Sequence, residues 1–211
     1  MKKYNLYLIA AIVFVSAAIA SCNKDKDDGD NGLSTSTVTT IDATVEGGDA
    51  LNDLIDEVRL VGSFGERAVL ATAKFSNGGF KIDLPKTLPS NVLESIEGRL
   101  QDGVNVSNKN VKWTRTDMRA YDKDDNLIGR LYYSKSDENT WVYVDFIYSD
   151  GDCNITGNVL DEKGIIPVTY SVSLKKGWNQ MFNITNGLFN DEQEQISTTT
   201  IQSGLKWVFG L

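Results

Sequence analysis

The stretch WVYVDFIY (residues 141–148) is the most strand-like run in the chain. Aromatic and β-branched residues dominate it, and these residue types favour the pleated, half-buried surface of a sheet. Alternation places Val142, Val144, Phe146 and Tyr148 on one uniformly apolar or aromatic face. We therefore predict that this face lies against the core. The other face carries Trp141, Tyr143, Asp145 and Ile147.

Similar runs on both sides of this stretch are bounded by turn signals such as Ser76-Asn77-Gly78-Gly79. Strands are predicted at residues 38–46, 55–61, 68–75, 80–84, 111–115, 118–121, 127–133, 154–160, 168–174, 180–184, 197–201 and 206–209. Short strands at this spacing predict an all-β fold, a β-sandwich of one or two packed modules.

One short helix interrupts this pattern. Asn91 is a capping residue followed three positions later by Glu94, and Gly98 is a typical helix end. The sequence therefore predicts a helix over residues 90–97.

The predicted strands group into an N-terminal β-sandwich-like module (residues 33–100) and a C-terminal β-sandwich module (residues 101–211). Whether these are two sandwiches or one is left open. In the first block, Gly78-Gly79-Phe80-Lys81-Ile82-Asp83-Leu84-Pro85 ends a strand after a hairpin. With this ending, residues 37–84 resemble the transthyretin-like or carboxypeptidase-regulatory-like β-sandwich, which implies the same fold class.

Residues 1–21 have the three parts of a secretory signal peptide. Lys2 and Lys3 form a basic start, residues 6–19 are mostly apolar, and the small residues Ala20 and Ser21 follow. The apolar run is shorter than the ~20 residues of a membrane-spanning helix. We therefore expect residues 1–21 to be removed.

The segment Ile19-Ala20-Ser21-Cys22 resembles the bacterial lipobox at every position. That resemblance implies lipidation of Cys22, with acyl chains such as palmitate that anchor the chain to a membrane. Two or three chains on one residue hold far more firmly than the marginal binding of a single chain. The alternative is a secreted protein whose first mature cysteine lies here.

Residues 22–32 are predicted to be a flexible acidic tether, because residues 23–32 contain no apolar side chain. The tether resembles the export signal of surface-exposed lipoproteins of the Bacteroidota. The segments Leu174–Asn179 and Leu205–Trp207 are similar to a recurrent type of unassigned function among them. The resemblance implies an outer-membrane location facing outward. The alternative is a plain linker on an anchor that faces the periplasm.

Composition narrows the function classes. The formal net charge is −8 and no basic cluster appears, which argues against a nucleic-acid partner. The chain has no histidine, which removes Ser-His-Asp triads and His-ligated zinc. If Cys22 carries lipid, Cys153 has no disulfide partner and is predicted to be a small buried hydrophobe.

Three sets of residues are candidates for a functional role. Asp122, Asp124 and Asn126 alternate as at the start of a calcium loop, but Leu127 and Tyr133 occupy the positions where an EF-hand needs Gly and Glu, so a turn is predicted. Asp150 and Asp152 flank a turn without an evident catalytic partner. Trp113, Trp141, Trp178 and Trp207 could stack on sugars, but the core is the first interpretation.

The sequence therefore predicts a lipid-anchored, non-catalytic binding or accessory module on the outer membrane, held through Cys22. We assign it no catalytic, cofactor-binding or metal-binding residue and no cofactor. A glycan or a protein is the expected ligand, and exposed aromatic residues on one face would favour a glycan. A structural or adhesive, pilus-like component is the first alternative, and a carboxylate-based hydrolase is the second.

Overall fold

Strands joined by tight turns make up the computed structural model, which describes residues 38–64, 67–188 and 193–210. The described strands are β1 (Thr40–Thr44), β2 (Glu57–Gly62), β3 (Val69–Ser76), β4 (Gly79–Asp83), β5 (Glu94–Ser95), β6 (Asn105–Val106), β7 (Lys112–Tyr121), β8 (Leu127–Ser136), β9 (Thr140–Ser149), β10 (Cys153–Leu160), β11 (Pro167–Leu174), β12 (Gly177–Asn186), β13 (Glu194–Thr198) and β14 (Lys206–Gly210). The 3-10 turns are η1 (Gly48–Leu51), η2 (Ser90–Val92) and η3 (Glu97–Arg99). The prediction of an all-β fold is confirmed.

The predicted signal peptide, Cys22 and the tether lie outside the described residues. Among the residues that are described, no helix is long and apolar enough to cross a membrane.

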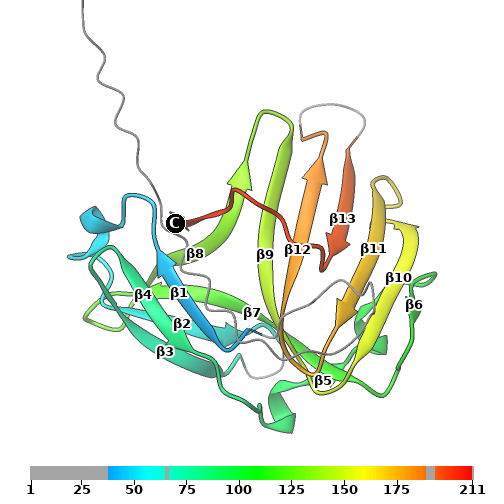
Figure 1. Cartoon of the computed structure of the whole chain (residues 1–211), viewed down its shortest axis with the longest axis horizontal. Helices are drawn as coiled ribbons and strands as arrows, with labels where there is room; N and C mark the ends of the chain where they lie inside the picture. Colours follow the sequence, from blue (N-terminus) through cyan, green and yellow to red (C-terminus); the bar gives the residue numbers. More distant parts are fainter. Residues whose placement is uncertain (1–37, 65–66, 189–192, 211) are drawn as a thin grey trace, which may run out of the picture. The chain divides into compact units, whose positions relative to one another are not determined.

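The strands form one continuous path, β1-β4-β3-β2-β7-β8-β9-β12-β13-β11-β10-β6. In Figure 1, strands β9, β12, β13, β11 and β10 stand side by side, and β7 passes beneath them. Strand β14 pairs with β8 outside this path, and Val45 beside β1 forms a single parallel bridge to Trp207. The described residues between 38 and 210 form one compact unit, and the β2–β7 pairing carries the sheet across position 100.

The first core lies on the face of β9 that the sequence predicts. Phe146 and Tyr148 are buried there, and Trp207 of β14 lies in the middle of the cluster. The Trp207 ring is 5.2 Å from Phe80 of β4, 5.3 Å from Tyr133 of β8 and 6.0 Å from Phe146, centroid to centroid. This indole therefore joins β4 to the consecutive strands β8 and β9, which lie much later in the sequence. The other buried members are Ile41, Ala43, Val45, Ile55, Val58, Leu60, Phe75, Ile82, Leu84, Met118, Ala120, Leu131 and Trp178.

A second core lies against the opposite face of β9, where Ile147 is fully buried. Its other buried members are Ile96, Val111, Trp113, Cys153, Ile155, Val172, Leu174 and Met181. Cys153 is a free, buried thiol among the described residues, as predicted. Strand β9 is thus buried on both faces toward its C-terminal end, whereas the sequence predicts one core face.

The predicted helix over residues 90–97 is wrong. Residues 90–92 and 97–99 each form one 3-10 turn, and β5 between them pairs with Trp113 and Lys112 of β7. Leu93 is extended, with φ −107° and ψ 139°. This arrangement buries both Val92 and Ile96, and the sheet pairing overrides the local helix signal. The predicted strands 111–115 and 118–121 are one strand, β7.

A matched pair of tryptophan substitutions, one in each core, tests the hydrogen bond of the Trp178 indole. The Nε1–H of Trp178 donates to the carbonyl of Pro85 at 2.8 Å, whereas the buried Nε1 of Trp113 has no acceptor among the described residues. We expect Trp178→Phe to lower the free energy of unfolding by ~1–3 kcal/mol more than Trp113→Phe, because only the former breaks a hydrogen bond. Urea unfolding of both variants measures this difference. Equal losses would contradict the assigned hydrogen bond.

Candidate functional site

Strands β7, β8 and β9 separate in the middle and leave an opening in the sheet. Strand β7 pairs with β9 at Trp113, Thr114 and Arg115, and with β8 only from Met118 onward. Strand β8 meets β9 only from Ser134 onward. Between these ladders, the hydroxyl of Thr116 donates to the carbonyl of Phe146 at 2.9 Å. Side chains around this opening can therefore reach spaces on both faces of β9.

Polar side chains line up across the sheet beside this opening. Tyr143 of β9 is opposite Asn183 of β12, which is opposite Ser197 of β13, which is opposite Tyr170 of β11. Residues directly opposite in neighbouring strands share a face. We call these four residues the polar row, and all four are half-buried.

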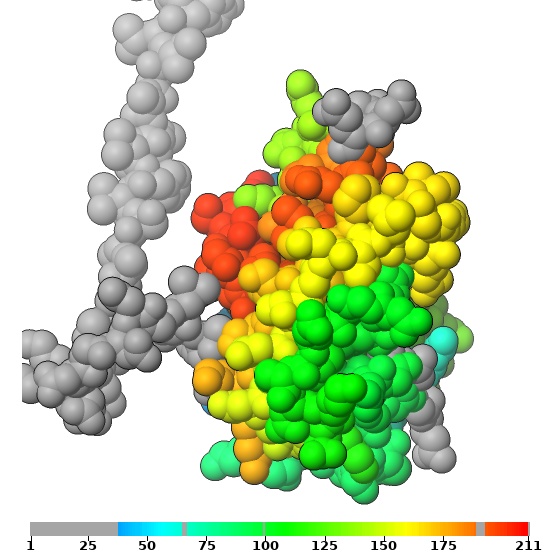
Figure 2. All heavy atoms as spheres, turned by 90° about the vertical axis from the view of Figure 1, so that its right-hand side faces the viewer, coloured from blue at the N-terminus to red at the C-terminus, as the bar shows by residue number. Residues whose placement is uncertain are grey.

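The sheet edge beyond Tyr170 is covered by a short segment. Tyr170 is opposite Gly157 of β10, and β6 pairs with the same strand. A Cβ atom at Gly157 would lie 3.0 Å from the Gly103 carbonyl oxygen, so this close approach favours glycine. Figure 2 shows the green segment near residues 100–110 against the yellow strand β10. The polar row is thus closed at one end by backbone.

A buried carboxylate lies next to the polar row, on the same face of β9 as Tyr143. Asp145 of β9 is only 8% exposed, and its Oδ2 accepts from Arg115 Nη2 at 2.7 Å and from Asn183 Nδ2 at 2.8 Å. Asn183 in turn accepts from the hydroxyl of Ser197 at 3.0 Å through its Oδ1. Arg115, by contrast, keeps 39% of its side chain exposed. The network therefore runs from a buried anion to a partly open cation.

The environment shifts the proton affinities of this network. Burial raises the pKa of the Asp145 carboxyl above its ordinary value, while the charge of Arg115 and the hydrogen bond from Asn183 act in the opposite direction. Burial and the nearby charge of Asp145 raise the pKa of the Tyr143 hydroxyl. Burial also raises the pKa of Tyr170. Both phenols are therefore neutral donors and acceptors at neutral pH.

A cavity of ≈ 270 Å³ lies above the polar row. Its apolar lining comes from the second core and its surroundings: Phe64, Leu100, Trp113, Ile155, Val168, Val172 and Met181. Its polar lining consists of the polar row together with Arg115 and Gln195. Arg115 is the single charged side chain among the described residues that line it. We call this space the row cavity.

A second cavity, of ≈ 190 Å³, lies at the opening between β7, β8 and β9. It shares Arg115 and Tyr143 with the row cavity and adds Trp141, Tyr132 and Tyr133. Trp141 is 39% exposed and its ring lies 4.7 Å from that of Tyr143. Both carboxylates that line it form ion pairs: Asp145 with Arg115, and Asp117 with Arg119 at 3.1 Å between Oδ2 and Nη2.

The candidates from the sequence fall in different places. Asp122 accepts backbone N–H groups from Asp124 and Asn126, at 2.9 and 2.8 Å, which makes residues 122–126 the predicted turn. Asp150 accepts the N–H of Lys112, and Asp152 accepts that of Lys176. The described part of the chain contains no group of three or more potential metal-ligating side chains.

The four tryptophans separate into two classes. Trp113, Trp178 and Trp207 are 5%, 3% and 7% exposed and belong to the cores, whereas Trp141 is exposed beside the second cavity. Sequence reasoning missed the pair Arg115–Asp145. The one available signal was the single acid within the apolar run 141–148, which does not identify a partner thirty positions earlier.

No protein-family model matches this chain, and no curated protein or solved structure matches it significantly.

Removal of Arg115 tests the ion pair. Arg115→Met leaves the buried Asp145 without its cation, and we expect a loss of stability at pH 7 approaching the ~3–5 kcal/mol typical of broken buried pairs. The pKa of Asp145 then rises further, so the folded state binds its proton more tightly than the unfolded chain does. Stability consequently falls as pH rises above ~4 through that raised pKa.

The deficit of Arg115→Met relative to wild type is therefore expected to be smaller at pH 5 than at pH 7. Urea unfolding at both pH values gives the comparison. Asp145→Asn is the control, because it has no carboxyl to titrate at this position and its deficit should change much less with pH. A deficit in Arg115→Met that is the same at pH 5 and pH 7 would argue against a buried ionised carboxylate.

Proposed function

We propose that this chain is a lipid-anchored protein of the cell envelope whose β-rich unit is displayed on the outer membrane and binds a ligand without catalysis. The anchor is Cys22, for which the support is the sequence pattern of residues 1–22. The observation that carries the binding role is the row cavity, in which a charged network and the polar row face an apolar surface.

The row cavity has the features of a ligand site rather than of a packing defect. Ligand pockets combine an apolar lining with a few placed polar groups. Here strand register sets the positions of Tyr143, Asn183, Ser197 and Tyr170, and two hydrogen bonds fix the amide of Asn183. Burial of Asp145 costs desolvation that apolar residues would avoid, so a functional role for the network accounts for its presence.

Protease treatment of intact cells tests the anchor and its orientation. We expect the wild-type protein to be clipped on whole cells, because the tether would hold it on the outer face of the membrane. Cys22→Ala should be lost from the membrane fraction, since the lipid supplies the attachment. Fractionation and immunoblotting of both proteins give the readout.

The same experiment tests surface display and lipid anchoring separately. Protection of the wild type until the outer membrane is breached would contradict surface display. Retention of Cys22→Ala in the membrane fraction would contradict lipid anchoring.

A structural or adhesive role is the second candidate, and the open edge of β1 favours it. The backbone N–H of Leu84 donates to the carbonyl of Thr39, and that of Val45 donates to the carbonyl of Gly78, both on the β4 side. The backbone N–H and C=O groups of the even-numbered residues of β1 therefore point to the other side. On that side, the backbone N–H groups of Val38 and Glu46 donate to the carbonyls of Trp178 and Trp207, respectively. A groove of ≈ 220 Å³ lies between, beside Thr40 and Asp42, and such an edge can accept an added strand.

A proline in β1 separates the two roles. Asp42→Pro removes an N–H that points to the open edge, and edge positions of this kind tolerate proline. We expect the variant to fold and, for a strand-accepting protein, to lose assembly into polymers on size-exclusion chromatography. Polymers that persist in Asp42→Pro would contradict strand addition at this edge. Thr40→Ala serves as the control that keeps the backbone donor.

A further inference from the structure

We propose that the row cavity binds an uncharged ring compound with one apolar face and a hydrogen-bonding edge, and that Asp145 imposes this neutrality by cancelling the charge of Arg115. The inference rests on the binding role proposed above and specifies the chemical class of the ligand. A neutral sugar and a neutral nucleoside share this chemistry.

The charge balance of the row cavity favours an uncharged ligand. Arg115 is the single cation among its described lining residues, and Asp145 lies 2.7 Å from Arg115 Nη2, so the pair is neutral as a unit. An anionic ligand would place a second negative charge beside a half-buried guanidinium whose charge is already balanced, near a carboxylate shielded from water. The net charge of −8 opposes an anion at longer range as well.

The two sides of the cavity carry the second step. Trp113, Ile155, Val172 and Met181 form an apolar surface from the second core. The polar row with Gln195 supplies hydroxyl and amide groups that can both donate and accept. A ligand matches both sides when it presents a ring face to the first and hydroxyl, carbonyl or amide groups to the second.

The size of the cavity carries the third step. At ≈ 270 Å³, it lies just below the ~300–1,000 Å³ range of pockets for drug-sized ligands. One ring, or two small ones, fits this space. The polar lining residues are half-buried, so the cavity is open to solvent and a ligand can enter without a rearrangement of the sheet.

Matched neutral and anionic probes test the inference on the full-length protein in detergent. The first pair is glucose and glucuronate, and the second is uridine and uridine monophosphate. Ligand-observed NMR titrations give the affinities. We expect at least one neutral probe to bind wild type roughly tenfold or more tightly than its anionic partner, and the pair that responds identifies sugar or nucleoside as the source.

Asp145→Asn keeps the shape of the site and leaves the Arg115 charge unbalanced. We expect it to reverse the preference, with the anionic partner gaining roughly tenfold through a charge-assisted hydrogen bond. Gln195→Lys adds a cation to the same lining without touching the buried pair, so it tests the same expectation if Asp145→Asn does not fold.

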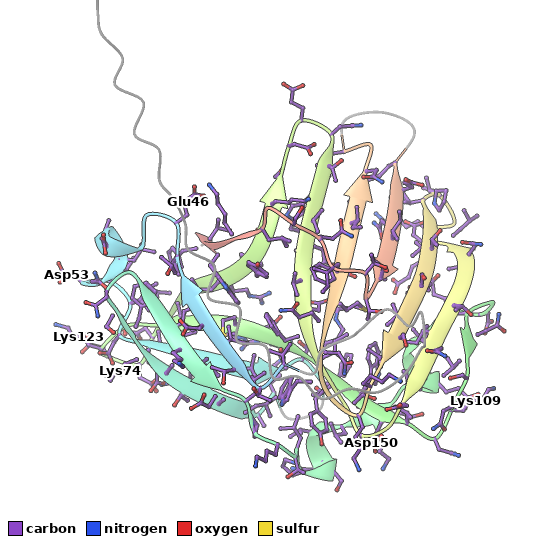
Figure 3. All side chains as sticks on the ribbon, in the orientation of Figure 1. Glu46, Asp53, Lys74, Lys109, Lys123 and Asp150 are labelled. Carbon is purple, nitrogen blue, oxygen red and sulfur yellow. The ribbon has the colours of Figure 1, made fainter. Side chains whose placement is uncertain are left out.

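Asp53→Asn is the matched control, since it makes the same change in net charge beside η1. Asp53 is exposed there, at the left of Figure 3 and away from β12 and β13. It should leave both affinities unchanged. Three results would overturn the inference: binding of no probe, equal affinity of wild type for neutral and anionic partners, or an unchanged preference in both cavity variants. None of them alters the outcome of the Cys22 experiment, which tests the anchor separately.

Discussion

Burial of β9 on both faces is the constraint on which the rest of the structure depends. The strand pairs with β12 over its whole length, from Thr140 opposite Asn186 to Ser149 opposite Gly177. Phe146 and Tyr148 reach the first core, while Ile147 reaches the second. Since the described residues contain no disulfide, packing around this strand holds the β-rich unit together. The 90–99 segment contributes Ile96 to the core on one of these faces.

The same constraint explains why the ion pair lies where it does. Asp145 and Ile147 share a face of β9, so the burial of Ile147 in the second core draws Asp145 partly out of water as well. A carboxylate at that depth needs a cation and a fixed donor. Arg115 supplies the cation because β7 leaves β9 immediately after Arg115 pairs with Ile147. Asn183 supplies the donor from the neighbouring strand.

The sequence predicts most of the strand positions, because alternation and turn residues are local signals. It places β13 at 197–201 instead of Glu194–Thr198 and does not predict the two-residue strands β5 and β6. The Asp122 turn follows from short-range chemistry that any chain with those side chains would show. The helix over 90–97 failed because Glu94 pairs with Trp113, a contact that only the folded chain provides. The Arg115–Asp145 pair was inaccessible for the same reason, since thirty residues separate partners that sheet topology brings together. The first interpretation from the sequence places all four tryptophans in the core, and it is wrong for Trp141, which is exposed at the opening between β7, β8 and β9.

The energetics of the network bear on its purpose. A buried ion pair contributes little to stability, and apolar replacements of similar volume are often neutral or favourable. The first core shows that this chain can fill space with aromatic rings, as Trp207 does between Phe80, Tyr133 and Phe146. Around Asp145, by contrast, an arginine, an amide and a hydroxyl form a connected chain of hydrogen bonds beside the row cavity. Fixed donors and acceptors with balanced charge discriminate between ligands. A ligand group that does not match them loses its hydration without gaining a hydrogen bond, which lowers its affinity. We propose on these grounds that the arrangement selects a ligand rather than supports the fold.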